Sequence, residues 1–159
     1  MINVFLLLGS NLGDRRAYLH QAIQHIEDDV APLTKTSAIY ETQSWGKTNS
    51  PDYLNQVVLL QTELPAQTVL QKILHIEWVI GRTREEKWGP RIIDIDLLFY
   101  GDAIIDQPGF IVPHPELHKR RFTLDPLAEI APDFMHPLFQ KSVLQLKNGL
   151  IDDLIVKKL

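Results

Sequence analysis

The sequence predicts an α+β fold, and two kinds of hydrophobic periodicity in the stretch ending at Tyr100 indicate it. Apolar runs of strand length alternate with longer segments whose apolar residues recur at helical spacing. Their order is β-α-β-β-α-β, the order of the ferredoxin-like core, in which an antiparallel sheet carries helices on one face. A chain of 159 residues suits one compact domain, so we expect residues 1–159 to form a single domain.

The first three predicted elements are a strand, a helix and a second strand. Residues 3–8, which are apolar after Asn3, give the first strand, which ends where Gly9 opens a run of turn residues. Asp14 is a favoured N-cap residue, so we expect the helix to run from there to about Asp28. The second strand, rich in threonine, is predicted at 34–40. The apolar positions at helical spacing in the helix are Leu19, Ala22, Ile23 and Ile26.

The second half of the core has the order strand, helix, strand. A strand is predicted at 54–62, where apolar residues and threonine dominate. Pro65 suits the first turn of a helix, and Gly81 is placed to end it. The fourth strand is predicted at 92–100, and Gly101 follows it.

Two long polar loops and a C-terminal region complete the chain. The loops, 43–52 and 83–90, flank the fourth strand, and long loops inside a compact domain are usually functional or disordered. We therefore expect them to take part in function. Beyond Ala103 we expect a hairpin-like segment and then short helices that elaborate the same domain. These short helices are predicted at 115–121, 125–130 and 142–146.

The composition argues against several classes of protein. There is no cysteine, which excludes disulfides and thiolate metal sites and makes a reducing cytoplasm the expected compartment. The apolar N-terminus, residues 1–9, is too short to span a membrane. A net charge of −4 argues against a nucleic-acid-binding surface. We therefore expect small-molecule partners, with no nucleic acid and no membrane.

Two acids on the fourth predicted strand are the sharpest functional signal. Asp94 and Asp96 alternate with Ile93, Ile95 and Leu97, so the carboxylates should project from one face and the apolar side chains into a core. Residues two apart on a strand lie roughly 7 Å apart along the backbone. Their carboxylates can therefore converge on two divalent ions about 4 Å apart. The alternative is a solvated strand edge, which the apolar character of this strand disfavours.

Basic residues gather in two places in this acidic chain. Arg82, Arg84, Lys87 and Arg91 precede the acid pair, and a second basic cluster occupies 118–121. Either cluster alone is explained by a solvated turn. Together with the acid pair they indicate a site, because phosphoryl transfer from a magnesium nucleotide requires carboxylates for metal beside guanidinium groups for phosphate.

Other residues are candidates for contact with a flat or anionic ligand. Trp45, Trp88 and Phe122 lie in polar, loop-like stretches, where either stacking on a ligand or anchoring of the loop explains them. Asn55 offers both a donor and an acceptor, as a heteroaromatic amide needs, although an asparagine that opens a strand is often a turn residue. His114, between two prolines, either contacts phosphate or caps the following helix.

These motifs resemble those of the hydroxymethyl-dihydropterin pyrophosphokinases of folate biosynthesis. The resemblance runs over most of the chain and rests above all on Arg91-x-x-Asp94-x-Asp96 and on Pro113-His114-Pro115. The other matching motifs are Gly9-Ser10-Asn11-Leu12-Gly13, Tyr40-Glu41-Thr42, Tyr53-Leu54-Asn55, Gly81-Arg82, Trp88-Gly89-Pro90 and Arg120-x-Phe122.

The resemblance implies a transferase of ferredoxin-like fold that moves pyrophosphate from ATP to the hydroxymethyl group of 6-hydroxymethyl-7,8-dihydropterin and releases AMP. It implies that Asp94 and Asp96 bind two magnesium ions, that Arg82 and Arg91 contact phosphate during catalysis, and that mobile loops close over the site. The implied nucleotide-binding residues are Glu77, Arg84, Trp88, Arg91, His114 and Arg120. The implied pterin-binding residues are Thr42, Trp45, Tyr53, Asn55, Trp88, Asp94 and Phe122.

The sequence departs from the family pattern at Gln43, Trp45, Gly109 and Ile111, which bears on affinity and leaves the acid pair untouched. We expect a cytoplasmic monomer. No general base stands out, and bound metal could instead lower the hydroxyl pKa. Two rival classes are a metal-dependent nucleotidyltransferase, which would release pyrophosphate, and a ligand-binding module without ATP turnover.

Overall fold

The computed structural model describes residues 1–43, 52–81, 92–152 and 154–159. The strands are β1 (Ile2–Ser10), β2 (Leu33–Thr36), β3 (Tyr40–Thr42), β4 (Tyr53–Thr62), β5 (Asp94–Tyr100), β6 (Ile105–Gln107), β7 (Phe110–Val112) and β8 (Val156–Lys158). The helices are α1 (Arg15–Asp29), α2 (Ala66–Gly81), α3 (Arg121–Ile130) and α4 (Val143–Asn148), with a short 3₁₀ helix at Leu117–Lys119.

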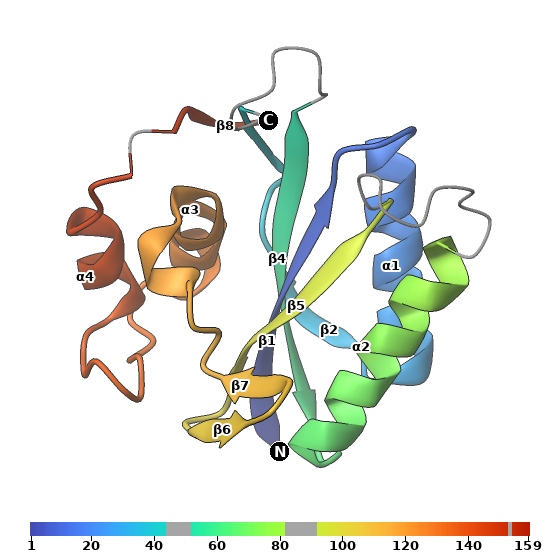
Figure 1. Ribbon diagram of the computed structural model, residues 1–159, viewed down its shortest axis with the longest axis horizontal. Helices are drawn as coiled ribbons and strands as arrows, with labels where there is room; N and C mark the ends of the chain where they lie inside the picture. The colour runs from blue at the N-terminus through green and yellow to red at the C-terminus, as the bar shows by residue number, and fades with distance from the viewer. Residues whose placement is uncertain (44–51, 82–91, 153) are drawn as a thin grey trace.

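The main sheet is antiparallel in all its described pairings and has the order β5-β1-β4-β3-β8, with β2 also paired to β4. Figure 1 shows α1 and α2 on one face of this sheet and α3 and α4 on the other. The predicted mixture of helices with an antiparallel sheet is therefore confirmed. So is the predicted hairpin beyond Ala103, because β6 and β7 form an antiparallel pair of their own.

The central strand β1 is buried on both sides. Val4, Leu6 and Leu8 face α1 and α2, whereas Phe5 and Leu7 face α3. A strand covered on both faces needs apolar residues at every position, which is why β1 reads as an unbroken apolar run instead of an alternating one. The next element starts as predicted, since the Asp14 side chain accepts a hydrogen bond of 3.2 Å from the Ala17 N–H and caps α1.

The strand predicted at 34–40 is instead two strands, β2 and β3, separated at Ser37. The Ser37 N–H donates to the Val57 carbonyl oxygen at 2.8 Å, and the Ser37 hydroxyl accepts from the Val57 N–H at 2.9 Å. A side-chain oxygen thus replaces the backbone acceptor at this point, and regular pairing stops. The strand β8 is a second feature that the sequence did not reveal, because Val156-Lys157-Lys158 is short and mostly charged.

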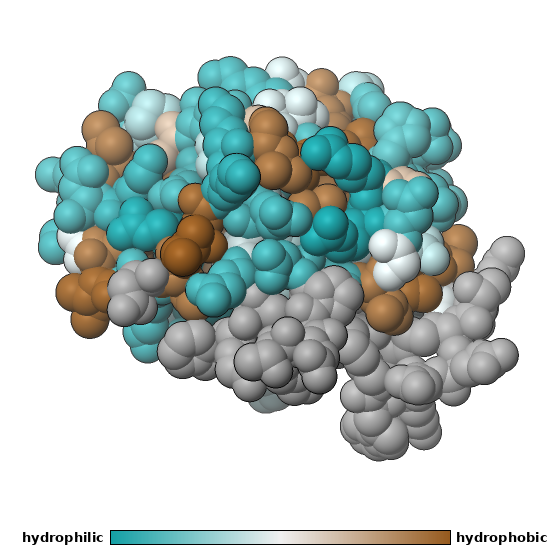
Figure 2. Space-filling model, turned by 90° about the horizontal axis from the view of Figure 1, so that it is seen from above, coloured by the Kyte–Doolittle hydropathy of each residue, from teal (hydrophilic) through white to brown (hydrophobic). Residues whose placement is uncertain are grey.

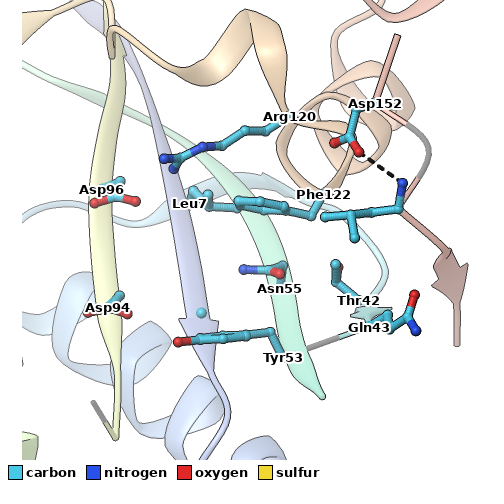
Figure 3. A pocket seen from close by; sticks show the side chains of 12 residues that line it. Leu7, Thr42, Gln43, Tyr53, Asn55, Asp94, Asp96, Arg120, Phe122 and Asp152 are labelled. Atoms are coloured by element: carbon cyan, nitrogen blue, oxygen red, sulfur yellow. Dashed lines mark hydrogen bonds between the residues drawn. The ribbon is translucent and has the colours of Figure 1, made fainter. Parts of the chain in front are cut away.

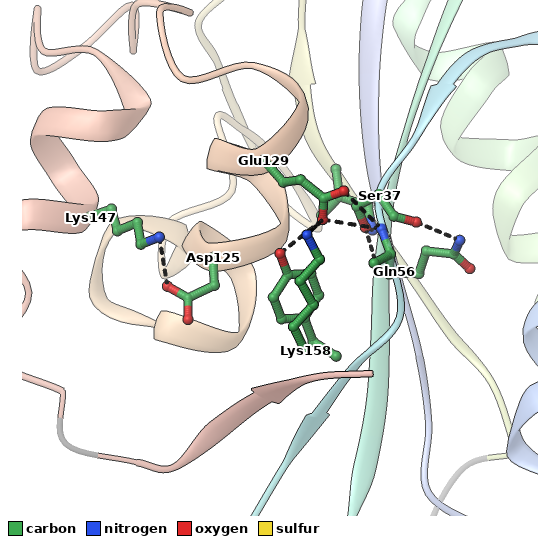
Figure 4. A network of polar contacts seen from close by, with 9 residues as sticks. Ser37, Gln56, Asp125, Glu129, Lys147 and Lys158 are labelled. Carbon is green, nitrogen blue, oxygen red and sulfur yellow. Dashed lines mark hydrogen bonds and ion pairs between the residues drawn. The ribbon is translucent and has the colours of Figure 1, made fainter.

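Glu129 of α3 joins this broken edge to the rest of the molecule (Figure 4). Its carboxylate accepts hydrogen bonds from the Tyr40 hydroxyl at 2.8 Å and from the Ala38 N–H at 3.1 Å. It also lies 3.9 Å from the Lys158 ammonium of β8. Burial, together with the bond to Glu129, raises the pKa of Tyr40. The cluster fixes α3 against β3 and β8.

No helix in the described part of the chain combines the length and apolar character needed to cross a membrane.

Replacing Ser37 by alanine should lower the free energy of unfolding by about 1–3 kcal/mol, because the buried Val57 N–H then loses its acceptor. Urea titration measures this change. The matched control is Thr36→Ala at the neighbouring position, the last residue of β2, whose exposed side chain should contribute less than about 0.5 kcal/mol. An equal loss in both variants would mean that strand propensity, and not the Ser37 hydroxyl, is responsible.

His136, between α3 and α4, is a buried histidine in an aromatic environment. Its ring is stacked on Phe139 with centroids 4.3 Å apart and meets the Phe99 ring edge-on at 5.5 Å. Its Nδ1 atom accepts hydrogen bonds from the N–H groups of Leu138 at 3.1 Å and Phe139 at 3.2 Å. Burial, and to a lesser degree the nearby His118, lowers the pKa of His136 to about 4. The neutral ring is therefore the form that this site accepts.

This pKa predicts a loss of stability in mild acid. In the unfolded chain the histidine takes up a proton below about pH 6.5, whereas the folded protein delays uptake to about pH 4. Stability should therefore fall as pH drops through this window, by roughly 1.4 kcal/mol for each unit of pKa shift. In His136→Asn, an amide oxygen can accept the same hydrogen bonds without titrating. Urea titrations at several pH values should give a flatter profile for this variant. A parent and variant with identical pH profiles would contradict the assignment.

Candidate active site

The register of the sheet brings residues from distant parts of the chain onto one face. Gly9 of β1 lies opposite Asp94 of β5 on one side and opposite Asn55 of β4 on the other. One step along, Leu7 lies opposite Asp96. These side chains lie at the end of the sheet where β4 and β5 begin. Seen from that end, the described surface is mostly hydrophilic, with apolar side chains in small separate patches (Figure 2).

The predicted alternation on the fourth strand is confirmed. Ile93, Ile95 and Leu97 are buried in the core beneath α1 and α2. Asp94 and Asp96 project from the opposite face, where both line a cavity. The carboxylates therefore share one concave site, as the spacing of two residues on a strand requires.

This cavity is the larger of the two cavities described in this section. Its volume of about 550 Å³ is within the range of small-molecule sites. Figure 3 shows the rings of Phe122 and Tyr53 on either side of Asn55, with Asp94 and Asp96 on β5 across from Thr42. One side of the cavity is therefore apolar and aromatic, and the other carries the acids. Its lining comprises Leu7, Gly9, Thr42, Gln43, Tyr53, Asn55, Asp94, Asp96, Arg120, Phe122, Asp152 and Leu154.

Polar groups on the floor of the cavity explain why residue 9 is a glycine. The Asn55 amide lies over Gly9, and its Nδ2 atom donates to the Leu8 carbonyl oxygen at 3.4 Å. A Cβ atom at position 9 would lie only 2.8 Å from that nitrogen, so any larger residue would displace the amide. Nearby, the buried Thr42 hydroxyl has no hydrogen-bond partner among the described residues. A ligand that supplies one would satisfy it.

A second cavity of about 320 Å³ lies between α2 and β7 and shares Asp96 with the first. Glu77 of α2 lines it and accepts a hydrogen bond of 2.8 Å from the Ile95 N–H, so this acid also supports the start of β5. Gly109 and Ile111, two of the departures from the family pattern, are in its lining. Asp96 therefore stands on the border between two cavities.

His114 lines the second cavity as well. Its Nδ1 atom accepts from the Glu116 N–H at 3.1 Å and so holds the turn before the 3₁₀ helix, but the helix itself has no side-chain cap, contrary to the predicted capping role. In the neutral ring the proton is therefore on Nε2. Burial lowers the pKa of His114, and the neighbouring Asp96 opposes that shift. Contact with phosphate stays a prediction.

The adjacent arginines at the start of α3 have different partners. Arg120 lines the larger cavity, with its guanidinium carbon 5.5 Å from the centre of the Phe122 ring. Arg121 turns away and lies 3.7 Å from the Asp125 carboxylate. Adjacent residues at a helix start point in different directions, so only Arg120 of the two lines the site. No sequence pattern indicated Asp152 and Leu154, which line the cavity because the C-terminal segment folds back.

Five predicted site residues lie outside the described part of the chain: Trp45, Arg82, Arg84, Trp88 and Arg91. Among the described residues, no group of three or more histidine, aspartate or glutamate side chains is placed to hold a metal ion. The pair Asp94 and Asp96 remains. Magnesium commonly takes one or two carboxylates and completes its shell with water and phosphate oxygens. The pair therefore fits a metal that arrives with a nucleotide better than a permanently bound structural ion.

Comparison with known proteins agrees with this geometry. Residues 5–132 match the family described as 7,8-dihydro-6-hydroxymethylpterin-pyrophosphokinase (HPPK). The 2-amino-4-hydroxy-6-hydroxymethyldihydropteridine pyrophosphokinase of Aquifex aeolicus is 43% identical over 147 residues, 92% of this chain and 91% of the relative. The protein of the same name from Bacillus subtilis is 42% identical over 127 residues, 79% of this chain and 76% of the relative.

Among solved structures, wild-type HPPK-DHPS of Plasmodium falciparum with STZ-DHP is similar in fold, with a TM-score of 0.77 and 16% sequence identity. The alignment covers 92% of this chain and 43% of that one, so the chain spans less than half the length of that structure. Family match and sequence identity over most of the chain lead to one conclusion: the chain belongs to the 7,8-dihydro-6-hydroxymethylpterin-pyrophosphokinase family of transferases.

Proposed function

We propose that this protein transfers pyrophosphate from ATP to the hydroxymethyl group of 6-hydroxymethyl-7,8-dihydropterin in folate biosynthesis. The observation that carries the proposal is the position of Asp96, which lines both cavities and is two residues from Asp94. A pyrophosphoryl transfer needs two substrates that meet at a metal-bound phosphate chain. Two cavities that share one acid of the pair, Asp96, supply that arrangement.

The larger cavity is suited to the pterin. The aromatic rings of Phe122 and Tyr53 offer faces on which a flat heteroaromatic ring can stack. The amide of Asn55 and the hydroxyl of Thr42 can exchange hydrogen bonds with the ring nitrogens, amino group and carbonyl of such a ligand. The acid pair then lies at the end of the ligand that carries the hydroxymethyl group.

The second cavity is suited to the nucleotide. Apolar side chains of α2 and β7 line it and would contact the base and sugar. His114 and Arg120 are near its junction with the first cavity and would contact phosphate, as the family resemblance implies. Glu77 serves here by holding the Ile95 N–H and hence the start of β5. The roles of Arg82, Arg84, Trp88 and Arg91 in binding phosphate and closing the site belong to this proposal.

In the reaction the hydroxymethyl oxygen attacks the β-phosphorus of ATP, the bond from that phosphorus to the α-phosphate oxygen breaks, and AMP leaves. Asp94 and Asp96 would hold two magnesium ions, which would neutralise charge on the phosphate chain and lower the pKa of the hydroxyl. The arginines stabilise the charge that develops on the phosphate oxygens. Thr42, Asn55 and Phe122 orient the pterin so that its hydroxymethyl group points at the reacting phosphorus.

Finer points of fold and assembly belong to the same proposal. The order β5-β1-β4, with β2 and β3 beyond it, is what a ferredoxin-like core requires, and α3 and α4 would be its C-terminal elaboration. The protein would act as a cytoplasmic monomer, with loops 43–52 and 83–90 closing over the substrates to exclude water.

The reaction products provide the direct test. The purified protein, incubated with ATP, magnesium and 6-hydroxymethyl-7,8-dihydropterin, should form AMP in step with the pterin diphosphate. Chromatography with mass detection identifies both. Omitting magnesium should stop the reaction, because the charge on the triphosphate would then face the acid pair unshielded. ADP would indicate a simple kinase, pyrophosphate a nucleotidyltransferase, and a lack of pterin-dependent turnover a binding module. Each of these would overturn the proposal.

Replacing Asp94 or Asp96 by asparagine should lower turnover by at least about 100-fold, since each change removes a charge that holds metal. The folded structure should survive, and relief of repulsion between two neighbouring carboxylates favours it. Steady-state assays measure the loss, and circular dichroism checks the fold. Asp102→Asn, in the exposed turn after β5, is the matched control and should retain parental activity. Activity of the Asp94 and Asp96 variants within about tenfold of the parent would contradict the metal assignment.

A further inference from the structure

The C-terminal segment, residues 152 and 154–159 and here named the tail, contributes to the wall of the larger cavity. Asp152 and Leu154 belong to the cavity lining. The tail lies beyond residue 132, the last residue that matches the family. The family match therefore assigns no role to the tail.

One end of the tail is joined to the sheet. β8 pairs with β3, so that Val156 lies opposite Thr42. The pairing continues on both sides, because the Gln43 N–H donates to the Ile155 carbonyl oxygen at 3.2 Å and the Leu159 N–H donates to the Ile39 carbonyl oxygen at 2.9 Å. The wall of the cavity that carries Thr42 and Gln43 is thus held by the tail.

The other end of the tail is joined to α3 through Asp152. One carboxylate oxygen accepts a hydrogen bond of 3.0 Å from the Arg121 N–H, at the first residue of the helix. The other accepts from the Leu154 N–H at 2.9 Å, and the Asp152 backbone oxygen accepts from the Arg121 guanidinium at 3.4 Å. A negative charge at the N-terminus of a helix is favourable. One carboxylate oxygen therefore fixes the start of α3, and the other fixes the tail itself at Leu154.

The start of α3 is the part of the helix that forms the site. Arg120 precedes it and Phe122 is its second residue, and both line the cavity. Figure 3 shows Asp152 beside the Phe122 ring, on the side away from the acid pair. The tail thus links two opposite walls, one on β3 and one on α3, with Asp152 as the connection to the second.

We infer that Asp152 is a positioning residue of the larger cavity: it joins the tail to α3 and thereby sets where Arg120 and Phe122 lie relative to Thr42. The identity of the ligand in this cavity rests on the proposed function, but the positioning role does not. Loss of Asp152 should release the start of α3 and widen the cavity. This change should weaken ligand binding more than it slows the chemical step.

The experiment compares the parent with Asp152→Ala, Asp152→Asn and a control, Lys157→Ala, which changes an exposed side chain of the same tail. Hydrogen exchange at the amides of residues 120–124 needs no ligand. It should become faster in Asp152→Ala, less so in Asp152→Asn, which keeps one acceptor oxygen, and not at all in the control. Exchange in β1 should stay unchanged, which separates local release from global destabilisation.

The second measurement is the affinity for 6-hydroxymethyl-7,8-dihydropterin, by calorimetry in the presence of magnesium and a non-hydrolysable ATP analogue. Asp152→Ala should bind the pterin about tenfold more weakly, corresponding to the loss of a charged hydrogen bond. Its KM for the pterin should rise more than kcat falls. Its KM for ATP should rise less than its KM for the pterin, because only Arg120 of the displaced residues contacts phosphate in the proposed function. Asp152→Asn should recover part of the loss.

The outcomes separate the two proposals. Faster exchange at 120–124 with weaker pterin binding supports the inference. Unchanged exchange in Asp152→Ala overturns it, and so does an equal rise in exchange along the whole chain. A parent that does not bind the pterin overturns the proposed function, and the exchange data then decide the positioning role alone.

Discussion

The pairing of β1 with β5 on one side and β4 on the other is the constraint on which the site depends. It places Gly9 between Asp94 and Asn55, three residues that are far apart in the sequence. Because side chains on a strand alternate between faces, a slip of one residue between β1 and β5 would send the acids into the core. Burial of β1 on both faces makes such a slip costly, since every position of the strand has a required partner.

Strand β5 contributes side chains both to the site and to the apolar core beneath α3. An irregularity in its pairing with β1 allows one face of the strand to do both. The register with β1 shifts between Phe5 and Leu6, opposite Leu98. Beyond the shift, Leu98 and Phe99 are both buried in the cluster beneath α3, on the face from which Asp94 and Asp96 project. A bulge of this kind redirects side chains along a strand. One face of β5 therefore changes from a polar site to an apolar core within a few residues.

Much of this arrangement could be predicted from the sequence. Periodicity located α1, α2 and the long strands, since these elements bury a continuous apolar face, and the spacing of Asp94 and Asp96 gave their shared orientation. Two features could not be found this way. The break at Ser37 depends on a hydroxyl that happens to reach Val57, and β8 forms from a short charged segment that becomes a strand only because β3 offers it an edge. Asp152 lines the site for the same reason, because the C-terminal segment is held beside the cavity by the pairing of β8 with β3. Such features depend on contacts between distant segments, which the local sequence pattern does not predict.

The position of Asp96 on the border of two cavities has a consequence for how ligands influence each other. Under the proposed function, a charged ligand bound in one cavity would alter the electric field in the other through this shared carboxylate. The two binding equilibria are then thermodynamically linked. If the first ligand changes the affinity for the second by some factor, the second changes the affinity for the first by the same factor. Cooperativity between the occupants thus follows from where one side chain stands and needs no change of shape in the protein.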